Sequence, residues 1–230
     1  AKRLQAVRPT HEQIQQIRTV YKRNIVADAQ AVIAALQFLG HHVYIISGGL
    51  AEPVREFGVY LGVPKANIRA VQVDYDKLAG DWWYAETDFQ KPKRQRYIDY
   101  EEGALTESDG KAKIVKELLG TQNGRSLLIG DGSSDLLASR TVDLFVGFGG
   151  VVQRERVKAE SPVFLHTPSL APLLLLAAGP AAVRQVKDTP HETVFQKAFT
   201  LANTGAFNFN HERLKEKFQQ AYQALYSRAD

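Results

Sequence analysis

The chain has 230 residues, of which 44% are hydrophobic and 23% charged, and its formal net charge is +4. These proportions are those of an ordinary globular protein, and the charge is too small to indicate a nucleic-acid partner. The absence of cysteine excludes disulfides, thiolate metal sites and cysteine nucleophiles. A cysteine-free chain suits the reducing cytoplasm, which is where we expect the protein to act.

Short apolar segments alternate with amphipathic segments through the first half of the chain. Apolar residues recur at helical spacing from residue 11 to residue 24, and Asp28 reads as the N-cap of a second helix that ends before Gly40. The remaining elements predicted in this half are a strand at 43–46, a helix at 52–61, a strand at 68–73, a hairpin at 71–86 with its turn at 79–81 and its return strand at 82–84, and a polar insertion at 87–110.

The second half repeats the alternation more regularly. The predicted elements are a helix at 111–119, strands at 127–129, 144–146 and 163–165, and helices at 133–138 and 153–159. Strands that alternate with helices are typical of a parallel sheet covered on both faces. The sequence therefore predicts an α/β fold, a Rossmann-like parallel sheet with helices on both faces, a partial helical cap and a C-terminal helical extension.

The predicted boundaries divide the chain into three parts. Residues 1–26 form the remainder of the cap, 27–178 form the core with a hairpin and loop insertion at 71–110, and 179–230 form the extension with helices near 192–201 and 212–226. The longest apolar run, at 169–183, contains two prolines and a glycine and is too short to span a bilayer. We also find no signal-peptide pattern at the start, and we expect no membrane partner.

Ligands of such sheets bind at the carboxyl ends of the strands, and the first strand with polar residues at its exit is followed by 47-SGG-49. Ser47 ends the predicted strand, and the glycines would allow backbone amides such as that of Gly48 to approach a phosphate near the next helix. A plain strand-to-helix turn explains the same residues equally well, because glycine is common in turns.

Lys111 lies at the start of the helix predicted at 111–119. The helix dipole disfavours cations at this end, so a bound anion accounts for a lysine here better than helix formation does. An exposed surface lysine is the alternative, since such lysines are common. Lys113 is a second candidate for the same role, two positions further into the helix.

Two acids follow the buried strand at 127–129: Asp131 at its exit and Asp135 one helical turn later. Two neighbouring carboxylates repel each other unless a cation lies close by, and hard oxygen ligands of this kind suit Mg²⁺. Alternatively, Asp131 caps the helix that begins at Ser133. Capping would explain one aspartate but not two.

A serine, a lysine and a GDxxxD motif, in this order, resemble the second to fourth motifs of the haloacid-dehalogenase-like phosphohydrolases, and within them the phosphoserine phosphatases. The resemblance covers roughly residues 1–175. It is carried by four stretches, 44-YIISGGLAEPVREFGVYLGVPKANI-68, 110-GKAKIVKEL-118, 127-LLIGDGSSDLLA-138 and 145-FVGFGGVVQRERVKAESP-162.

The resemblance implies a phosphatase that transfers a phosphoryl group in two steps through an aspartyl-phosphate. Ser47 and the Gly48 amide would bind the phosphoryl oxygens, and Lys111 would neutralise their charge. The substrate would be a small phosphate ester, most simply O-phosphoserine, which is converted to serine and phosphate. Arg3 corresponds to an arginine of the phosphoserine phosphatase cap that pairs with the substrate carboxylate.

The resemblance also implies a magnesium site. Asp131 would be the direct Mg²⁺ ligand, and Asp135 and Ser134 would support the metal and phosphate. Relatives more often carry asparagine or threonine where this chain has Ser134, although a hydroxyl can serve. Metal and lysine together would stabilise the charge on the transferring group.

One family motif is absent from the 46 residues that precede Ser47. This motif, DxDxT, supplies the nucleophile and the general acid from the end of a buried strand. Asp28 does not replace it, because it lies at a predicted helix start. Residues 1–17 resemble cap helices instead, and we expect the natural protein to continue upstream of Ala1 with the missing strand.

Several alternatives stay open. The same core serves other phosphate esters and phosphotransfer, and a degenerate scaffold without its nucleophile would be a binding module. The basic run 91-KPKRQR-96 is followed closely by acids and reads as a solvated loop, so we expect no nucleic acid. The 179–230 extension would either form an extra helical layer or mediate a homodimer.

Overall fold

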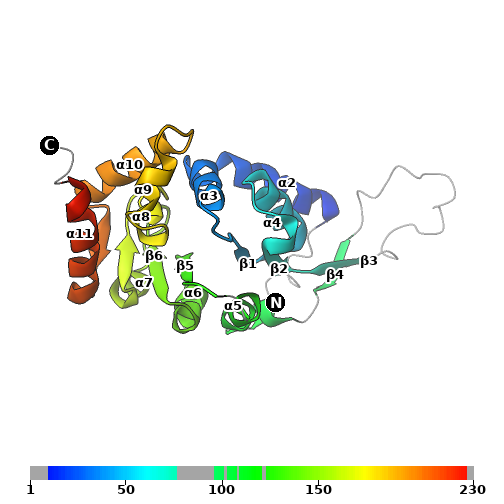
Figure 1. The fold of residues 1–230 in the computed structure, drawn as a ribbon. Helices are drawn as coiled ribbons and strands as arrows, with labels where there is room; N and C mark the ends of the chain where they lie inside the picture. The colour runs from blue at the N-terminus through cyan, green and yellow to red at the C-terminus, as the bar shows by residue number, and fades with distance from the viewer. Residues whose placement is uncertain (1–9, 77–95, 101–102, 108, 121–122, 227–230) are drawn as a thin grey trace. The chain divides into compact units, whose positions relative to one another are not determined.

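The computed structural model describes residues 10–76, 96–100, 103–107, 109–120 and 123–226. The chain forms two compact units, drawn in Figure 1. The first consists of Ala1–Ile25 with Tyr44–Gly110, and the second of Val26–Val43 with Lys111–Asp230. Each unit is described below by itself.

The first unit contains a pair of parallel strands and two helices that pack against each other. Its elements are α2 (His11–Arg23), β1 (Ile45–Leu50), α4 (Ala51–Tyr60), the 3-10 helix η1 (Lys65–Asn67), β2 (Ile68–Val71), β3 (Val73–Asp76), β4 (Arg96–Tyr100) and η4 (Ala104–Thr106). Glu56 of α4 accepts hydrogen bonds from Arg18 and Lys22 of α2 at 2.7 and 3.2 Å. The helix predicted at 11–24 is therefore confirmed as α2.

Thr10 fixes the start of α2. Its hydroxyl accepts a hydrogen bond from the Gln13 amide at 3.3 Å, and the Gln13 side chain accepts one from the Thr10 amide at 2.9 Å. This reciprocal pair is a capping box, which satisfies two amides that the first turn of a helix leaves without partners.

The strand predicted at 43–46 begins two residues later and continues through the glycines. Ile45 and Ile46 of β1 pair with β2 in parallel, and the register then shifts before Leu50 pairs with Val71. Residues 47–49 therefore lie in an irregular part of the strand rather than after it. Such irregularities are frequent next to active sites, where they redirect side chains.

The hairpin prediction is corrected in its pairing. The antiparallel partner of β3 is β4, which lies in the stretch predicted as a polar insertion. The predicted turn at 79–81 and return strand at 82–84 fall outside the described residues. The strand predicted at 68–73 is two strands, β2 and β3, separated by Gln72.

The second unit is built around a four-stranded sheet. Its strands are β5 (Leu127–Gly130), β6 (Leu144–Phe148), β7 (Val163–Leu165) and β8 (Phe207–Phe209), in this spatial order. The first three are parallel and β8 is antiparallel to β7. The predicted α/β class with parallel strands and flanking helices is confirmed. The short β8 was not predicted.

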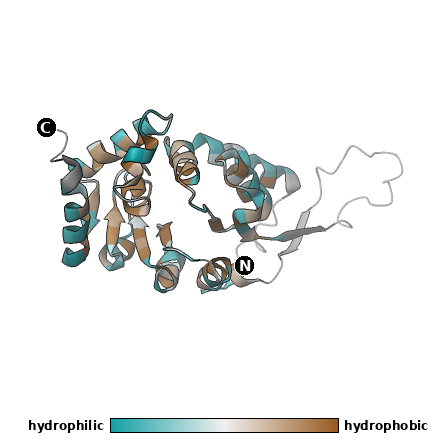
Figure 2. Ribbon diagram, viewed as in Figure 1, coloured by the Kyte–Doolittle hydropathy of each residue, from teal (hydrophilic) through white to brown (hydrophobic). Residues whose placement is uncertain are grey.

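Alternate residues of the central strands face opposite sides, as the period of a strand requires. Phe145 and Phe164 pack with residues of α6 (Ser133–Ala138) and α7 (Glu155–Glu160). Val146 and Leu165 belong to a separate cluster that includes residues of α8 (Leu173–Ala177). Both faces of the sheet are therefore covered. In Figure 2 these strands are coloured as hydrophobic, whereas α11 is mainly hydrophilic.

A further cluster joins helices that are far apart in the sequence. They are α3 (Ala29–Phe38), α8, α9 (Ala182–Val186), α10 (Glu192–Asn203) and α11 (Glu212–Tyr226). Ala35, Leu174 and Ala198 are fully buried in this cluster. Helix α5 (Gly110–Leu119), apart from its first residue, and the 3-10 helix η5 (Ser139–Thr141) also belong to this unit. The residues predicted as an extension thus contribute both β8 and part of this helical core.

Asp28 is the N-cap residue of α3, as predicted, but its side chain makes no capping hydrogen bond to that helix. The carboxylate accepts hydrogen bonds instead from the Ser169 hydroxyl, the Leu170 amide at 2.9 Å, the Ala171 amide at 3.3 Å and Lys197 Nζ at 2.8 Å. Burial raises the pKa of Asp28, but these hydrogen bonds outweigh it and the pKa lies below its ordinary value. The carboxylate is thus a buried link between three segments.

Within the part of the chain that the structure describes, no helix has the length and apolar character needed to cross a bilayer.

Candidate active site

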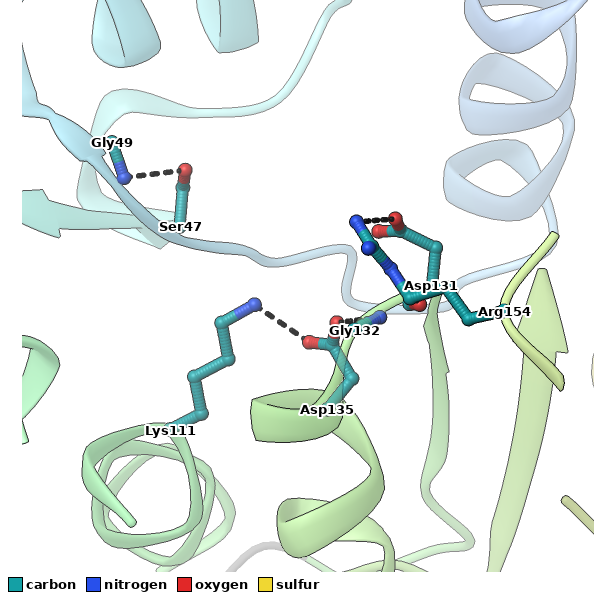
Figure 3. Close-up of polar contacts among 7 residues, drawn as sticks. All are labelled: Ser47, Gly49, Lys111, Asp131, Gly132, Asp135 and Arg154. Carbon is teal, nitrogen blue, oxygen red and sulfur yellow. Dashed lines mark hydrogen bonds and ion pairs between the residues drawn. The ribbon is translucent and has the colours of Figure 1, made fainter. Parts of the chain in front are cut away.

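The predicted site residues of the first unit are Ser47 and Gly48. The Ser47 hydroxyl accepts a hydrogen bond from the Gly49 amide at 3.0 Å (Figure 3). Gly48 is exposed, and a Cβ atom added to it would meet no atom within 4 Å. The space beside the Gly48 Cα is therefore open, as close approach of an anion to this backbone requires.

The two glycines in the turn between β5 and α6 each have a structural reason. A Cβ on Gly130 would lie 2.3 Å from Cγ of Asp135, so only glycine permits this carboxylate to lie against the end of the strand. Gly132 is the N-cap residue of α6, and its amide donates a hydrogen bond to Asp135 Oδ2 at 3.0 Å. The sequence GDGSSD thus brings Asp135 back onto the turn that precedes it.

Lys111 and Asp135 form a largely buried ion pair. Lys111 Nζ lies 2.6 Å from Asp135 Oδ1, and the two side chains are 18% and 9% exposed. Lys111 is the second residue of α5, at the helix start where the sequence predicts an anion. The anion that the structure places there is the carboxylate of Asp135. Both oxygens of Asp135 are bonded, one to Lys111 and the other to the Gly132 amide.

Asp131 is in a different environment from Asp135. Its carboxylate is half-exposed and contacts Arg154, whose Nη2 lies 3.3 Å from Oδ2 while Nε donates to the Asp131 carbonyl oxygen at 2.9 Å (Figure 3). The N-cap of α6 is Gly132 and not Asp131. The alternative in which Asp131 caps the helix is therefore wrong, and its accessible carboxylate needs another explanation.

The oxygen atoms at this turn would supply only part of the ligand shell of a hard cation. Among the described residues, Arg154 Nη2 is the hydrogen-bond donor found for the Asp131 carboxylate, and it bonds Oδ2, which leaves Oδ1 for a metal. The described residues contain no cluster of three acidic, histidine or cysteine side chains. Magnesium typically takes one or two carboxylates and completes its shell with water and substrate phosphate. Asp131 fits such a site as one ligand, whereas each oxygen of Asp135 already accepts a hydrogen bond.

Three predicted site residues remain: Ser134, Lys113 and Arg3. Ser134 is partly buried in the first turn of α6. Lys113, the alternative to Lys111, is exposed. Arg3 lies outside the described residues.

Two residues at this site were not found by sequence reasoning. Gly130 belongs to the GDxxxD motif, but the sequence does not show why glycine is needed there. The reason is that the Asp135 carboxylate lies against Gly130 in the fold. Arg154 lies within the quoted stretch at 145–162, but nothing in its local pattern distinguishes it from the nearby Arg156. Only the pairing of β5 with β6 brings the exits of these two strands together.

Comparison with other proteins supports the resemblance at the level of sequence. No protein-family profile matches the chain. Phosphoserine phosphatases from Bos taurus and Homo sapiens are each 29% identical to it over 157 residues, which cover 68% of this chain and 63% of theirs. The phosphoserine phosphatase of Drosophila melanogaster is also 29% identical, over 53% of its own length. The chain thus spans less than two thirds of these relatives.

Solved structures support the fold. A phosphoserine phosphohydrolase-like protein from Francisella tularensis aligns with a TM-score of 0.60 and 22% identity, covering 77% of this chain and 73% of the other. A structure described as a phospho-aspartyl intermediate analogue of phosphoserine phosphatase aligns with a TM-score of 0.54 and 17% identity, over 71% and 69%. The chain is therefore similar in sequence to phosphoserine phosphatases, and its fold is similar to those of these solved structures.

Proposed function

We propose that the protein is a Mg²⁺-dependent phosphomonoester hydrolase that acts on O-phosphoserine and releases serine and phosphate. The observation that carries the proposal is the turn after β5, where a half-exposed Asp131 lies next to an Asp135 that is held by Lys111. The same polar residues, in the same order, occur in the motifs by which the chain resembles phosphoserine phosphatases.

The residues of the second unit would divide the work. Bound Mg²⁺ would supply positive charge to the phosphoryl oxygens, and Asp131 Oδ1 would be one of its ligands. Lys111 would add a second positive charge, while Asp135 keeps its ammonium group in place through the 2.6 Å contact. Charge stabilisation of this kind is the main source of rate in phosphoryl transfer. Asp135 would therefore support the site without binding the metal.

The residues of the first unit would bind the phosphoryl group. Gly48 is exposed, and its amide would donate to a phosphoryl oxygen. The Ser47 hydroxyl accepts a hydrogen bond from the Gly49 amide, which leaves its own proton for donation to a phosphoryl oxygen. Arg3 is the proposed partner of the substrate carboxylate. Guanidinium suits this task because it binds a carboxylate through two parallel hydrogen bonds.

The nucleophilic aspartate would come from a further strand. Among the described residues β5 pairs with β6 alone, and its apolar residues Leu127, Leu128 and Ile129 are all partly exposed, whereas the middle of β6 is buried. We propose that a parallel strand carrying the DxDxT motif pairs with this open edge. Without such a strand the chain should hydrolyse O-phosphoserine negligibly, because no aspartyl-phosphate can form.

A panel of phosphate esters tests the substrate. Initial rates of phosphate release by the full-length protein should be highest for O-phosphoserine and at least about tenfold lower for O-phosphoethanolamine, which lacks only the carboxylate; a lost charged contact of this kind is worth about 1.5–3 kcal/mol. Equal or faster hydrolysis of the ester without a carboxylate would exclude phosphoserine as the preferred substrate. Binding of phosphoserine without any turnover would instead indicate a non-catalytic binding module.

We also propose that the protein acts in the cytoplasm and forms a homodimer. A cysteine-free chain is compatible with the cytoplasm. A homodimer through the C-terminal helices is a further expectation that sedimentation of the purified protein would test.

A further inference from the structure

Arg154 contacts two different atoms of one residue at the proposed site. Its Nε donates a hydrogen bond to the main-chain oxygen of Asp131 at 2.9 Å, and its Nη2 lies 3.3 Å from Asp131 Oδ2 (Figure 3). The planar guanidinium fixes the spacing of these two donors. A group that holds the backbone and the carboxylate of the same residue restricts rotation of the side chain between them.

The backbone that carries Arg154 is itself fixed on both sides. The Gly149 amide donates to the Leu165 carbonyl oxygen at 2.8 Å, and a Cβ on Gly150 would lie 2.3 Å from the carbonyl oxygen of Thr167, so this loop lies directly against the end of β7. On the other side, the Arg154 carbonyl accepts the Lys158 amide at 2.9 Å in the first turn of α7.

The helices after the two loops are joined by a small apolar cluster. Val157 of α7 is 1% exposed and packs with Leu136 of α6 and with Phe145 and Phe164 of the sheet. Leu136 directly follows Asp135 in the chain. The exits of β5 and β6, and with them Asp131 and Arg154, are therefore held in a fixed relation.

We propose that Arg154 is a positioning residue for a divalent cation bound by Asp131. It holds Oδ2 and the backbone of Asp131, so that Oδ1 is presented to the metal in one orientation. This inference rests on the proposed function, which makes Asp131 the metal ligand. Groups that orient a metal ligand through its second atom commonly change metal affinity by about 10–100-fold when they are removed.

Arg154 also has an electrostatic effect that weakens metal binding. Its guanidinium repels a cation bound to the same carboxylate. Both side chains are about half exposed, at 52% and 47%, and solvent screens charges at such positions strongly. The orientation of the carboxylate therefore outweighs the repulsion. The two effects predict changes of opposite sign when Arg154 is replaced, so binding data separate them.

The test uses Mn²⁺ as the probe, because its bound and free forms differ in electron paramagnetic resonance. The full-length protein is titrated as wild type and as Arg154→Ala, Arg154→Gln and Arg154→Lys, with Arg156→Ala as matched control. Arg156 is an exposed arginine of α7 that pairs with Glu160 and does not contact Asp131. We expect the dissociation constant to rise about tenfold in the first three variants and to stay unchanged in the control.

Each other outcome has a definite meaning. Tighter Mn²⁺ binding by Arg154→Ala or Arg154→Gln would overturn the inference, because Arg154 would then compete with the metal. Wild-type affinity in Arg154→Lys would also overturn it, since lysine keeps the charge without the two fixed donors. Asp131→Asn separates the two proposals: if it binds Mn²⁺ as well as the wild type, the proposed metal site fails, and if it alone weakens binding, only the role of Arg154 fails.

Discussion

Lys111 Nζ and Asp135 Oδ1 lie 2.6 Å apart, and both side chains are largely buried. Two residues separated by 24 positions in the chain thus form an ion pair at the start of α5 and α6. The pair accounts for a lysine at a helix start, where the helix dipole disfavours a cation. Lys111 therefore has two roles that experiments can separate: it would stabilise charge on the transferring phosphoryl group, and it neutralises the buried carboxylate of Asp135.

Replacement of Lys111 tests this separation. Lys111→Met should lower the rate of phosphate release by about 10²-fold or more, because a charge that stabilises the transition state is lost. It should also lower the free energy of unfolding, because Asp135 is left as a buried unpaired carboxylate. The double variant Lys111→Met/Asp135→Asn should regain much of the stability but none of the activity. Thermal unfolding and initial rates distinguish these effects.

The control for this experiment is Lys113→Ala, since Lys113 is exposed two residues further along α5. Its rate should stay close to that of the wild type. The reverse ranking, with Lys113→Ala inactive and Lys111→Met active, would transfer the role to Lys113.

Gly130→Ala tests why the GDxxxD motif begins with glycine. The added Cβ would lie 2.3 Å from Asp135 Cγ, so the carboxylate must move away from the strand end. We expect a loss of about 1–3 kcal/mol in the free energy of unfolding, as for other overpacked sites, together with lower activity. Gly48→Ala is the control for stability, because the space around Gly48 is open. Equal stability of both variants would contradict the steric argument.

Much of this fold follows from local pattern, and the parts that do not have physical reasons. The strands at β5, β6 and β7 are short apolar runs between helices, and they were predicted within two residues of their ends. The strand β8 was missed because a three-residue edge strand carries little periodicity. Asp28 was read as a cap of its own helix, since sequence reveals neighbours along the chain and not the amides of Leu170 and Ala171.

The same limit applies to the site. The order of Ser47, Lys111, Asp131 and Asp135 could be read directly, because each lies at the end of a predicted strand or in the first turn of a predicted helix. The bonding of Asp135 could not, since it depends on a turn that brings the acid back to Gly132. The difference between Asp135, whose two oxygens both accept hydrogen bonds, and the half-exposed Asp131 therefore depends on the fold.

The buried carboxylate of Asp28 predicts a pH dependence of stability. Its pKa is lowered in the folded protein despite its burial, chiefly by hydrogen bonds from Lys197 and Ser169. Folding therefore favours the ionised form, and this contribution is present above the ordinary carboxyl pKa of about 4 and is lost as the pH falls through the lower folded value. In Asp28→Asn this contribution should be absent.

The measurement is chemical unfolding of wild type and Asp28→Asn between about pH 7 and pH 3. The difference in their free energies of unfolding should shrink as the pH falls below about 4. A difference that stays constant over this range would show that the ionised carboxylate of Asp28 does not stabilise the fold.

The proposed chemistry depends above all on Asp131 as a metal ligand, and one assay measures whether it has this role. Phosphate release from O-phosphoserine by the full-length protein is measured with Mg²⁺ and with EDTA, for the wild type and for Asp131→Asn. Because Asp131 is half-exposed and does not cap α6, the variant should unfold at close to the wild-type temperature. We predict that activity requires Mg²⁺ in the wild type and is lost in Asp131→Asn. Near-normal turnover by the variant, or wild-type activity in EDTA, would contradict the account.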